Sequence, residues 1–251
     1  MPYVITILLY LLFLFVFGLR YVKRLKKKED FLVAGRSLTA PVLVGTLLAT
    51  WIGSGDIFSV SDLSYHHGYS SLIGSAGGWF GIIIVFFIAG RVRRFGQFTV
   101  PDILEARYNQ WARVLATITT IIAYVTIVSY QFRGGGWVLN TITDGKISDK
   151  QGIIIMAVFV VTYTMLAGML SVAHLDMFNG ILMITAFFIA VPFLIQHVGG
   201  LEFVAANVTP RAHPILGNMS LVQALGYFFP TLLLALGNGN MYQRFFSAKN
   251  E

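Results

Sequence analysis

Cysteine is absent from this sequence of 251 residues, and charged residues make up only 12% of it. The absence of cysteine excludes disulfides, thiol nucleophiles and cysteine-bearing metal sites. A soluble domain usually has about 25% charged residues, so a soluble domain is disfavoured. Hydrophobic residues instead make up 56% of the chain, and the mean hydropathy is +0.73. These values indicate a multi-pass membrane protein whose surroundings are the lipid bilayer.

Sequence patterns typical of catalysis are also missing. The chain contains no H-E-x-x-H, G-x-S-x-G or protein-kinase signature. His66 and His67 have no third metal ligand nearby, and Gly134-Gly135-Gly136 lacks the lysine of a phosphate-binding loop. We expect the three glycines to form a bend at the end of an apolar span. The sequence therefore predicts that the protein is not an enzyme.

Apolar runs divide the chain into about seven candidate spans, each near the roughly 20 residues that cross a bilayer. They cover approximately residues 3–19, 45–69, 72–89, 114–139, 152–167, 176–195 and 220–246. Fourteen Lys and Arg residues lie in the connections expected on the cytoplasmic side, and four lie in those expected outside. The positive-inside rule then places the N-terminus outside and the C-terminus in the cytoplasm. The net charge of +7 thus reflects topology and does not indicate a nucleic-acid partner.

The second span is the most informative part of the sequence, because Gly53-Ser54-Gly55-Asp56 lies within its apolar run. Glycine costs about 1 kcal/mol of helix stability relative to alanine, and a carboxylate near mid-bilayer costs roughly 2.5 kcal/mol or more. Both are tolerated where a helix unwinds and its freed carbonyls line a polar cavity, as in the ion and substrate sites of secondary transporters. We therefore predict a broken helix. The alternative is a glycine kink with the aspartate near the interface.

Other local signals complete the expected architecture. Gly237-Asn238-Gly239-Asn240 interrupts the last span, and we expect a second break there. The small residues at 74–78 favour close packing of the third span against another helix. Thr99 is a plausible N-cap of a short interfacial helix with Pro101 in its first turn. Residues 168–174 are expected to be a short connection.

Four motifs, taken together and in order, resemble those of the sodium:solute symporter family. Residues 30–38 (DFLVAGRSL) resemble the motif after the first span, and 99–108 (TVPDILEARY) the motif after the third. Residues 168–176 (GMLSVAHLD) resemble the turn between the fifth and sixth spans, and 243–249 (QRFFSAK) the end of the seventh. The chain departs from the family pattern at Ala167, where a second glycine is usual, and at Leu175, where threonine is common. These departures affect the subfamily more than the family.

The resemblance implies an all-α membrane fold of two inverted five-helix repeats, of the leucine-transporter type, with only the first repeat complete. Residues 1–23 would form a peripheral first span, 39–197 the first repeat, and 220–247 the first helix of the second repeat. Family members typically continue with about six more spans. The missing C-terminal half of the carrier is therefore expected as a partner in function.

The resemblance also implies a location in the plasma or inner membrane. It further implies which residues form the binding sites. The backbone carbonyls of Ala49 and Ile52 align with family ligands of the coupling ion Na⁺, although the residues alone would be read as helix packing. Asp176 aligns with an aspartate near the inward cation path, and its alternative role is to cap the sixth span, which it is expected to open. The expected contacts to a small polar organic solute are Ser54, Gly55, Asp56, Asn238, Asn240 and Tyr242. The implied function is sodium-coupled symport, and the alternative is a symporter-like membrane sensor domain without transport.

Overall fold

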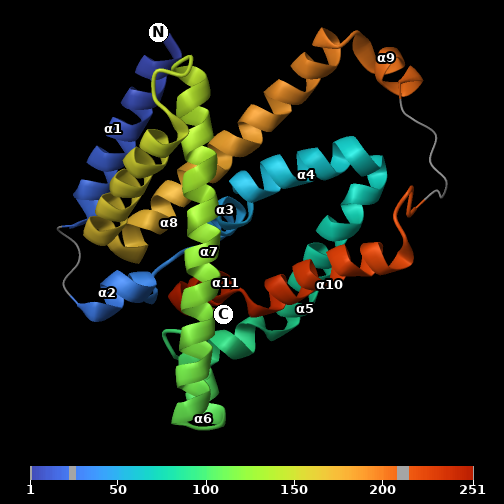
Figure 1. Cartoon of the computed structure of the whole chain (residues 1–251). Coiled ribbons are helices and arrows are strands. Elements are labelled where there is room, and N and C mark those ends of the chain that lie inside the picture. Colours follow the sequence, from blue (N-terminus) through green and yellow to red (C-terminus); the bar gives the residue numbers. More distant parts are fainter. Residues whose placement is uncertain (1, 23–26, 208–214, 251) are drawn as a thin grey trace.

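The computed structural model describes residues 2–22, 27–207 and 215–250. This part of the chain is helical and contains no strand, apart from one isolated bridge between Leu38 and Ala248. The α-helices are α1 (Pro2–Val22), α2 (Lys28–Val33), α3 (Ala40–Trp51), α4 (Ser54–His67), α5 (Leu72–Arg94), α6 (Val100–Arg107), α7 (Gln110–Ile142), α8 (Asp149–His197), α9 (Gly200–Ala206), α10 (Leu221–Gly237) and α11 (Gly239–Ser247) (Figure 1). Two 3-10 turns, η1 (Ala34–Arg36) and η2 (Gly68–Ser71), lie between them. The all-α class expected from the sequence is confirmed.

Long apolar helices make this a multi-pass membrane protein. Among the described residues, five segments are long and apolar enough to cross a bilayer: Tyr3–Arg20, Ser54–Arg94, Gln110–Ile142, Gly168–His197 and Leu221–Ser247. A shorter apolar helix, Ala40–Trp51, precedes the second of them. Seven crossings remain a prediction. Parts of two expected connections, residues 23–26 and 208–214, lie outside the described residues.

The expected connection at 168–174 is wrong, because a single residue makes the turn. Gly168, with φ +60° and ψ −179°, interrupts α8, and the chain is helical on both sides of it. A side chain is strained at this φ, and a Cβ would also lie 2.8 Å from the ring of Phe31. Asp176 consequently lies two turns inside the second half of α8, so it neither opens nor caps that helix. The alternative role as an N-cap is therefore excluded.

Small residues bring the spans together, as the sequence predicts. α5 and α10 run in the same direction and are in close contact along their length. At Gly81 of α5 an added Cβ would lie 2.5 Å from Cβ of Ala235, and the hydroxyl of Thr231 donates to the carbonyl of Gly74 at 2.6 Å. α3 packs against the second half of α8 in the same way, with Gly45 against Met177.

The four motif segments, 30–38, 99–108, 168–176 and 243–249, converge in space, and we call their assembly the motif hub. Val33 and Phe246 are both 0% exposed and pack together with hydrophobic residues of α6. The side-chain amide of Gln243 donates to the carbonyl of Leu32 at 2.8 Å. The amide of Leu38 donates to the carbonyl of Ser247 at 3.0 Å, forming part of the bridge. Ala34 and Leu38 also pack against Met169 and Ala173 of α8. The motifs that are separate in the sequence therefore form one structural unit.

Within the hub, α6 begins as predicted. The hydroxyl of Thr99 accepts from the amide of Asp102, and the amide of Thr99 donates to the Asp102 carboxylate at 2.9 Å. Pro101 lies in the first turn. These contacts satisfy amides that a helix start leaves without intrahelical acceptors.

α7 is one continuous helix of 33 residues, so the predicted bend at Gly134-Gly135-Gly136 is wrong. The glycines instead permit close approach of neighbouring helices. A Cβ on Gly134 would lie 2.5 Å from Cβ of Ser54 in α4, and one on Gly136 would lie 2.8 Å from Ile153 in α8. Because glycine costs only about 1 kcal/mol in a helix, the packing partners decide the conformation here.

Candidate functional site

The predicted break in the second span is confirmed between α3 and α4. Ile52 (φ −88°, ψ 97°) and Gly53 (φ −125°, ψ 179°) are extended, and helices flank them on both sides. In an unbroken helix the amides of Gly53 and Ser54 would donate to the carbonyls of Ala49 and Thr50. Here the amide of Gly53 donates to the carboxylate of Asp56 at 3.2 Å, and the amide of Ser54 donates to Oε1 of Gln131 at 2.9 Å. The carbonyls of Ala49 and Thr50 are thereby released from helical hydrogen bonds.

Asp56 also sets the direction of the Ile52 carbonyl. The carbonyl of Ile52 and the amide of Gly53 belong to one planar trans peptide, in which they point in opposite directions. Because the amide points at the Asp56 carboxylate, the carbonyl points away from it. Asp56 is the third residue of α4, and its carboxylate accepts from the amide of the N-cap residue Gly53. Its charge also lies at the favourable end of the helix dipole.

A second break separates α10 from α11, also as predicted. Asn238 has φ −70° and ψ 97°, nearly the conformation of Ile52 at the first break. Its side-chain oxygen accepts from the amide of Met241 at 3.2 Å and so caps α11. The amide of Asn240 donates to the hydroxyl of Tyr124 at 2.7 Å, and the carbonyl of Leu236 accepts from the hydroxyl of Tyr242 at 2.7 Å. Side chains therefore replace the helical bond between Asn240 and Leu236.

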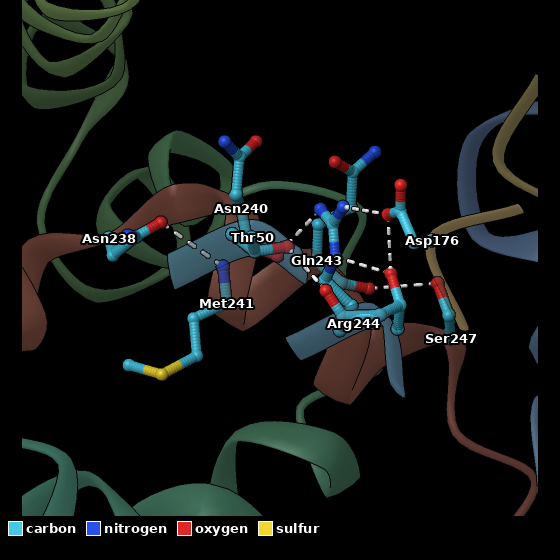
Figure 2. A network of polar contacts seen from close by, with 9 residues as sticks. Thr50, Asp176, Asn238, Asn240, Met241, Gln243, Arg244 and Ser247 are labelled. Carbon is cyan, nitrogen blue, oxygen red and sulfur yellow. Dashed lines mark hydrogen bonds and ion pairs between the residues drawn. The ribbon is translucent and has the colours of Figure 1, made fainter. Parts of the chain in front are cut away.

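A buried ionic network lies within two helical turns of the first break (Figure 2). The hydroxyl of Thr46 donates to Oδ2 of Asp176 at 2.7 Å, and Nη2 of Arg244 donates to the same oxygen at 3.2 Å. Nε of Arg244 donates to Thr46 Oγ1 at 3.2 Å. Thr46 is 0% exposed and Arg244 7% exposed. A buried charge needs a partner and hydrogen bonds, and the network supplies both while joining α3, α8 and α11.

Arg244 connects this network to the second break. Its Nη1 donates to the carbonyl of Asn240 at 3.2 Å, within α11. Figure 2 shows the Asn240 side chain directed away from Arg244, whereas the Asn238 side chain is turned toward Met241. The amide group of Asn240 is thus directed away from the network that holds its backbone.

The structure sorts the candidate site residues into three groups. Five lie at the first break: Ala49, Ile52, Ser54, Gly55 and Asp56. Asn238 and Asn240 lie at the second break. The two outliers are Asp176, in the ionic network, and Tyr242, which is 8% exposed and packs in the motif hub with Val33 and Phe246.

Four residues at the site were missed by the sequence reasoning: Thr46, Tyr124, Gln131 and Arg244. Tyr124 and Gln131 were detectable as polar side chains seven residues apart in an apolar span, a spacing that puts them on one helix face. Arg244 lies in the fourth motif but was counted only as a cytoplasmic charge. No sequence signal distinguishes its buried guanidinium from an exposed one.

The two broken helices, joined by buried polar contacts inside an apolar bundle, are features of a secondary membrane transporter. The sequence model of the sodium:solute symporter family matches residues 31–250. The chain belongs to the sodium:solute symporter family.

A solved structure supports the same fold. The chain is similar to a Na⁺-coupled sialic acid symporter in a substrate-bound, outward-open state, with a TM-score of 0.74 and 16% sequence identity. The match covers 96% of this chain and 52% of the symporter. At this identity the likeness concerns the fold, and the chain spans about half the length of that symporter.

Proposed function

We propose that this chain functions in sodium-coupled symport of a small polar organic solute, within a carrier that also has the helices of a second half. The observation that carries the proposal is the pair of diverted amides at Gly53 and Ser54, which releases backbone carbonyls at a half-buried break in an apolar span. Hard cations are coordinated by oxygen atoms, and released carbonyls supply these without burying another full charge. Membership of the symporter family points to sodium as the cation.

In this proposal the carbonyls of Ala49 and Ile52 are ligands of sodium. Asp176 contributes its second oxygen to the cation path, because Oδ2 already accepts from Thr46 and Arg244. The solute binds between the two breaks, near Ser54, Gly55, Asp56, Asn238 and Asn240. Tyr242 supports the second break rather than contacting the solute, since its hydroxyl already donates to Leu236.

The proposed topology has the N-terminus outside and the C-terminus in the cytoplasm of a plasma or inner membrane. The directions of packed helices agree with it. α5 and α10, the expected third and seventh spans, run in the same direction. α1 and the second half of α8, the expected first and sixth spans, run in opposite directions, with Tyr10 bonded to Asn179 and Phe13 against Phe178. Because successive spans cross the membrane in alternating directions, the third and seventh must be parallel and the first and sixth antiparallel.

The test is solute uptake by cells or proteoliposomes that contain the whole carrier. We expect a panel of labelled small polar organic solutes to include at least one that accumulates with an inward sodium gradient. The accumulation should disappear when potassium replaces sodium. If uptake is equal in the two cations, sodium coupling is wrong. If no solute is taken up although sodium binds, the sensor alternative replaces transport.

A further inference from the structure

One face of α7 carries two polar side chains that reach both breaks. Tyr124 and Gln131 are seven residues apart in a continuous helix, so they lie about 20° apart around the axis and about 10 Å apart along it. Tyr124 reaches the break between α10 and α11, and Gln131 reaches the break between α3 and α4. Two broken helices, distant in sequence, therefore rest on one straight helix.

Each of these side chains takes the hydrogen bond that would otherwise close its break. Oε1 of Gln131 accepts from both the amide and the hydroxyl of Ser54, at 2.9 and 2.5 Å. The hydroxyl of Tyr124 accepts from the amide of Asn240 at 2.7 Å and lies 3.5 Å from Oδ1 of Asn238. In a continuous helix the Ser54 amide would return to the carbonyl of Thr50, and the Asn240 amide to that of Leu236.

A glycine next to each amide admits the side chain from α7. A Cβ on Gly53 would collide with Nε2 of Gln131, and a Cβ on Gly239 would lie 3.0 Å from the Tyr124 hydroxyl. Both contacts need the backbone itself to approach α7. The arrangement thus repeats at the two breaks: a glycine, an amide without a helical acceptor, and an oxygen supplied by α7.

We propose that Tyr124 and Gln131 form a brace on α7 that holds both helices broken and fixes the spacing of the two breaks. They are positioning residues in this inference, which rests on the proposed function for its effect on sodium and solute. Without Gln131, the Ser54 amide can donate to the Thr50 carbonyl instead. This restores one helical hydrogen bond across the first break. The direction of the neighbouring carbonyls of Ala49 and Ile52 then changes, and sodium affinity falls.

The first measurement concerns the conformation of the chain and does not require transport. Spin labels at Val44 and Tyr65, on the exposed surfaces of α3 and α4, report the angle at the break by electron–electron distance. A continuous helix would place these backbone positions about 31 Å apart, and the broken helix places them closer, since α3 and α4 point in different directions (Figure 1). We expect Gln131→Leu to shift the distance distribution toward the longer value. Gln131→Glu, which keeps an acceptor oxygen, should retain the parental distance.

The second measurement is sodium-dependent solute binding by the whole carrier. Gln131→Leu and Tyr124→Phe should each weaken binding about tenfold, or about 1.4 kcal/mol. Thr126→Val is the matched control, because Thr126 lies on the same helix and bonds only within it, to Ile122. It should behave as the parent does in both measurements.

The outcomes separate the brace from the proposed function. An unchanged distance in Gln131→Leu overturns the brace, and weaker binding with that unchanged distance would make Gln131 a direct solute contact instead. A shifted distance in the control variant would also overturn it. A parent carrier that shows no sodium-dependent binding contradicts the proposed function, while the distance measurement still decides the brace.

Discussion

Arg244 is the residue whose replacement should cost the described bundle most. Its guanidinium donates to the side chains of Asp176 and Thr46 and to the carbonyl of Asn240, and only 7% of the residue is exposed. Arg244→Met keeps an unbranched side chain but removes every one of these donors. The carboxylate of Asp176 is then left inside the bundle, where it still accepts a hydrogen bond from the Thr46 hydroxyl.

The expected cost follows from that unpaired carboxylate. Removing one partner of a buried ion pair typically costs about 3–5 kcal/mol, so we expect Arg244→Met to lower the free energy of unfolding by roughly that amount. Arg244→Lys keeps the charge but loses the fork that reaches three acceptors, and should lose roughly 1.5–3 kcal/mol, the value of one hydrogen bond to a charged group. Combining Arg244→Met with Asp176→Asn removes both charges. The double variant should therefore be more stable than the sum of the two single effects predicts, by about 2 kcal/mol.

The assay is equilibrium unfolding of the purified chain in mixed micelles, followed by circular dichroism as denaturing detergent is added. Arg113→Met is the matched control. Arg113 forms a shorter ion pair, 2.7 Å to Glu105, but its side chain is 48% exposed, so its loss should cost about 0–1 kcal/mol. If Arg244→Met costs no more than this control, or if its effect adds to that of Asp176→Asn, the ionic network does not stabilise the fold as argued.

Three further predictions concern the site and the topology. Asp56→Asn in the whole carrier keeps an acceptor for the Gly53 amide but removes the charge. It should weaken sodium-dependent solute binding at least about tenfold. Equal affinities of parent and variant in titrations at matched sodium would show that the charge of Asp56 has no role in binding. Single cysteines at Lys146 and at Lys27 test the topology in intact cells. The first should react with an impermeant reagent and the second should not, and labelling at Lys27 would contradict the proposed orientation. Finally, the 251-residue chain alone should transport nothing, because the ligands expected from a second half are absent from it. Sodium-driven uptake by liposomes that contain only this chain would disprove the proposed carrier with a second half.

The breaks were predictable because their causes are local. Glycine, asparagine and aspartate inside an apolar run each oppose a regular membrane helix, and the structure interrupts the helices at Gly53 and Asn238. The Thr99 cap depends on residues three apart and was equally accessible. Asp176 was misplaced because residues 168–174 were interpreted as a short connection between two spans, whereas the positive φ of Gly168 alone makes the turn.

The partners of the breaks were not predictable from the same reasoning. Gln131 is 77 residues from Ser54, and Tyr124 is 116 residues from Asn240. A pattern in one span cannot specify which face of another span it meets. For the same reason Gly134-Gly135-Gly136 suggested a bend, since the sequence does not show that Ser54 and Ile153 pack directly on those glycines.

The motif hub has a consequence for the order in which the chain is made. Gln243 bonds Leu32 across 211 residues, and Phe246 covers Val33. A ribosome produces the early segment long before the late one, so Val33 lacks its contact with Phe246 until α11 has been made. Synthesis that stops before Phe246 leaves this hydrophobic surface open. The hub thereby distinguishes a chain that has reached α11 from one that has not, and an interrupted product presents the exposed surface that cellular quality control recognises.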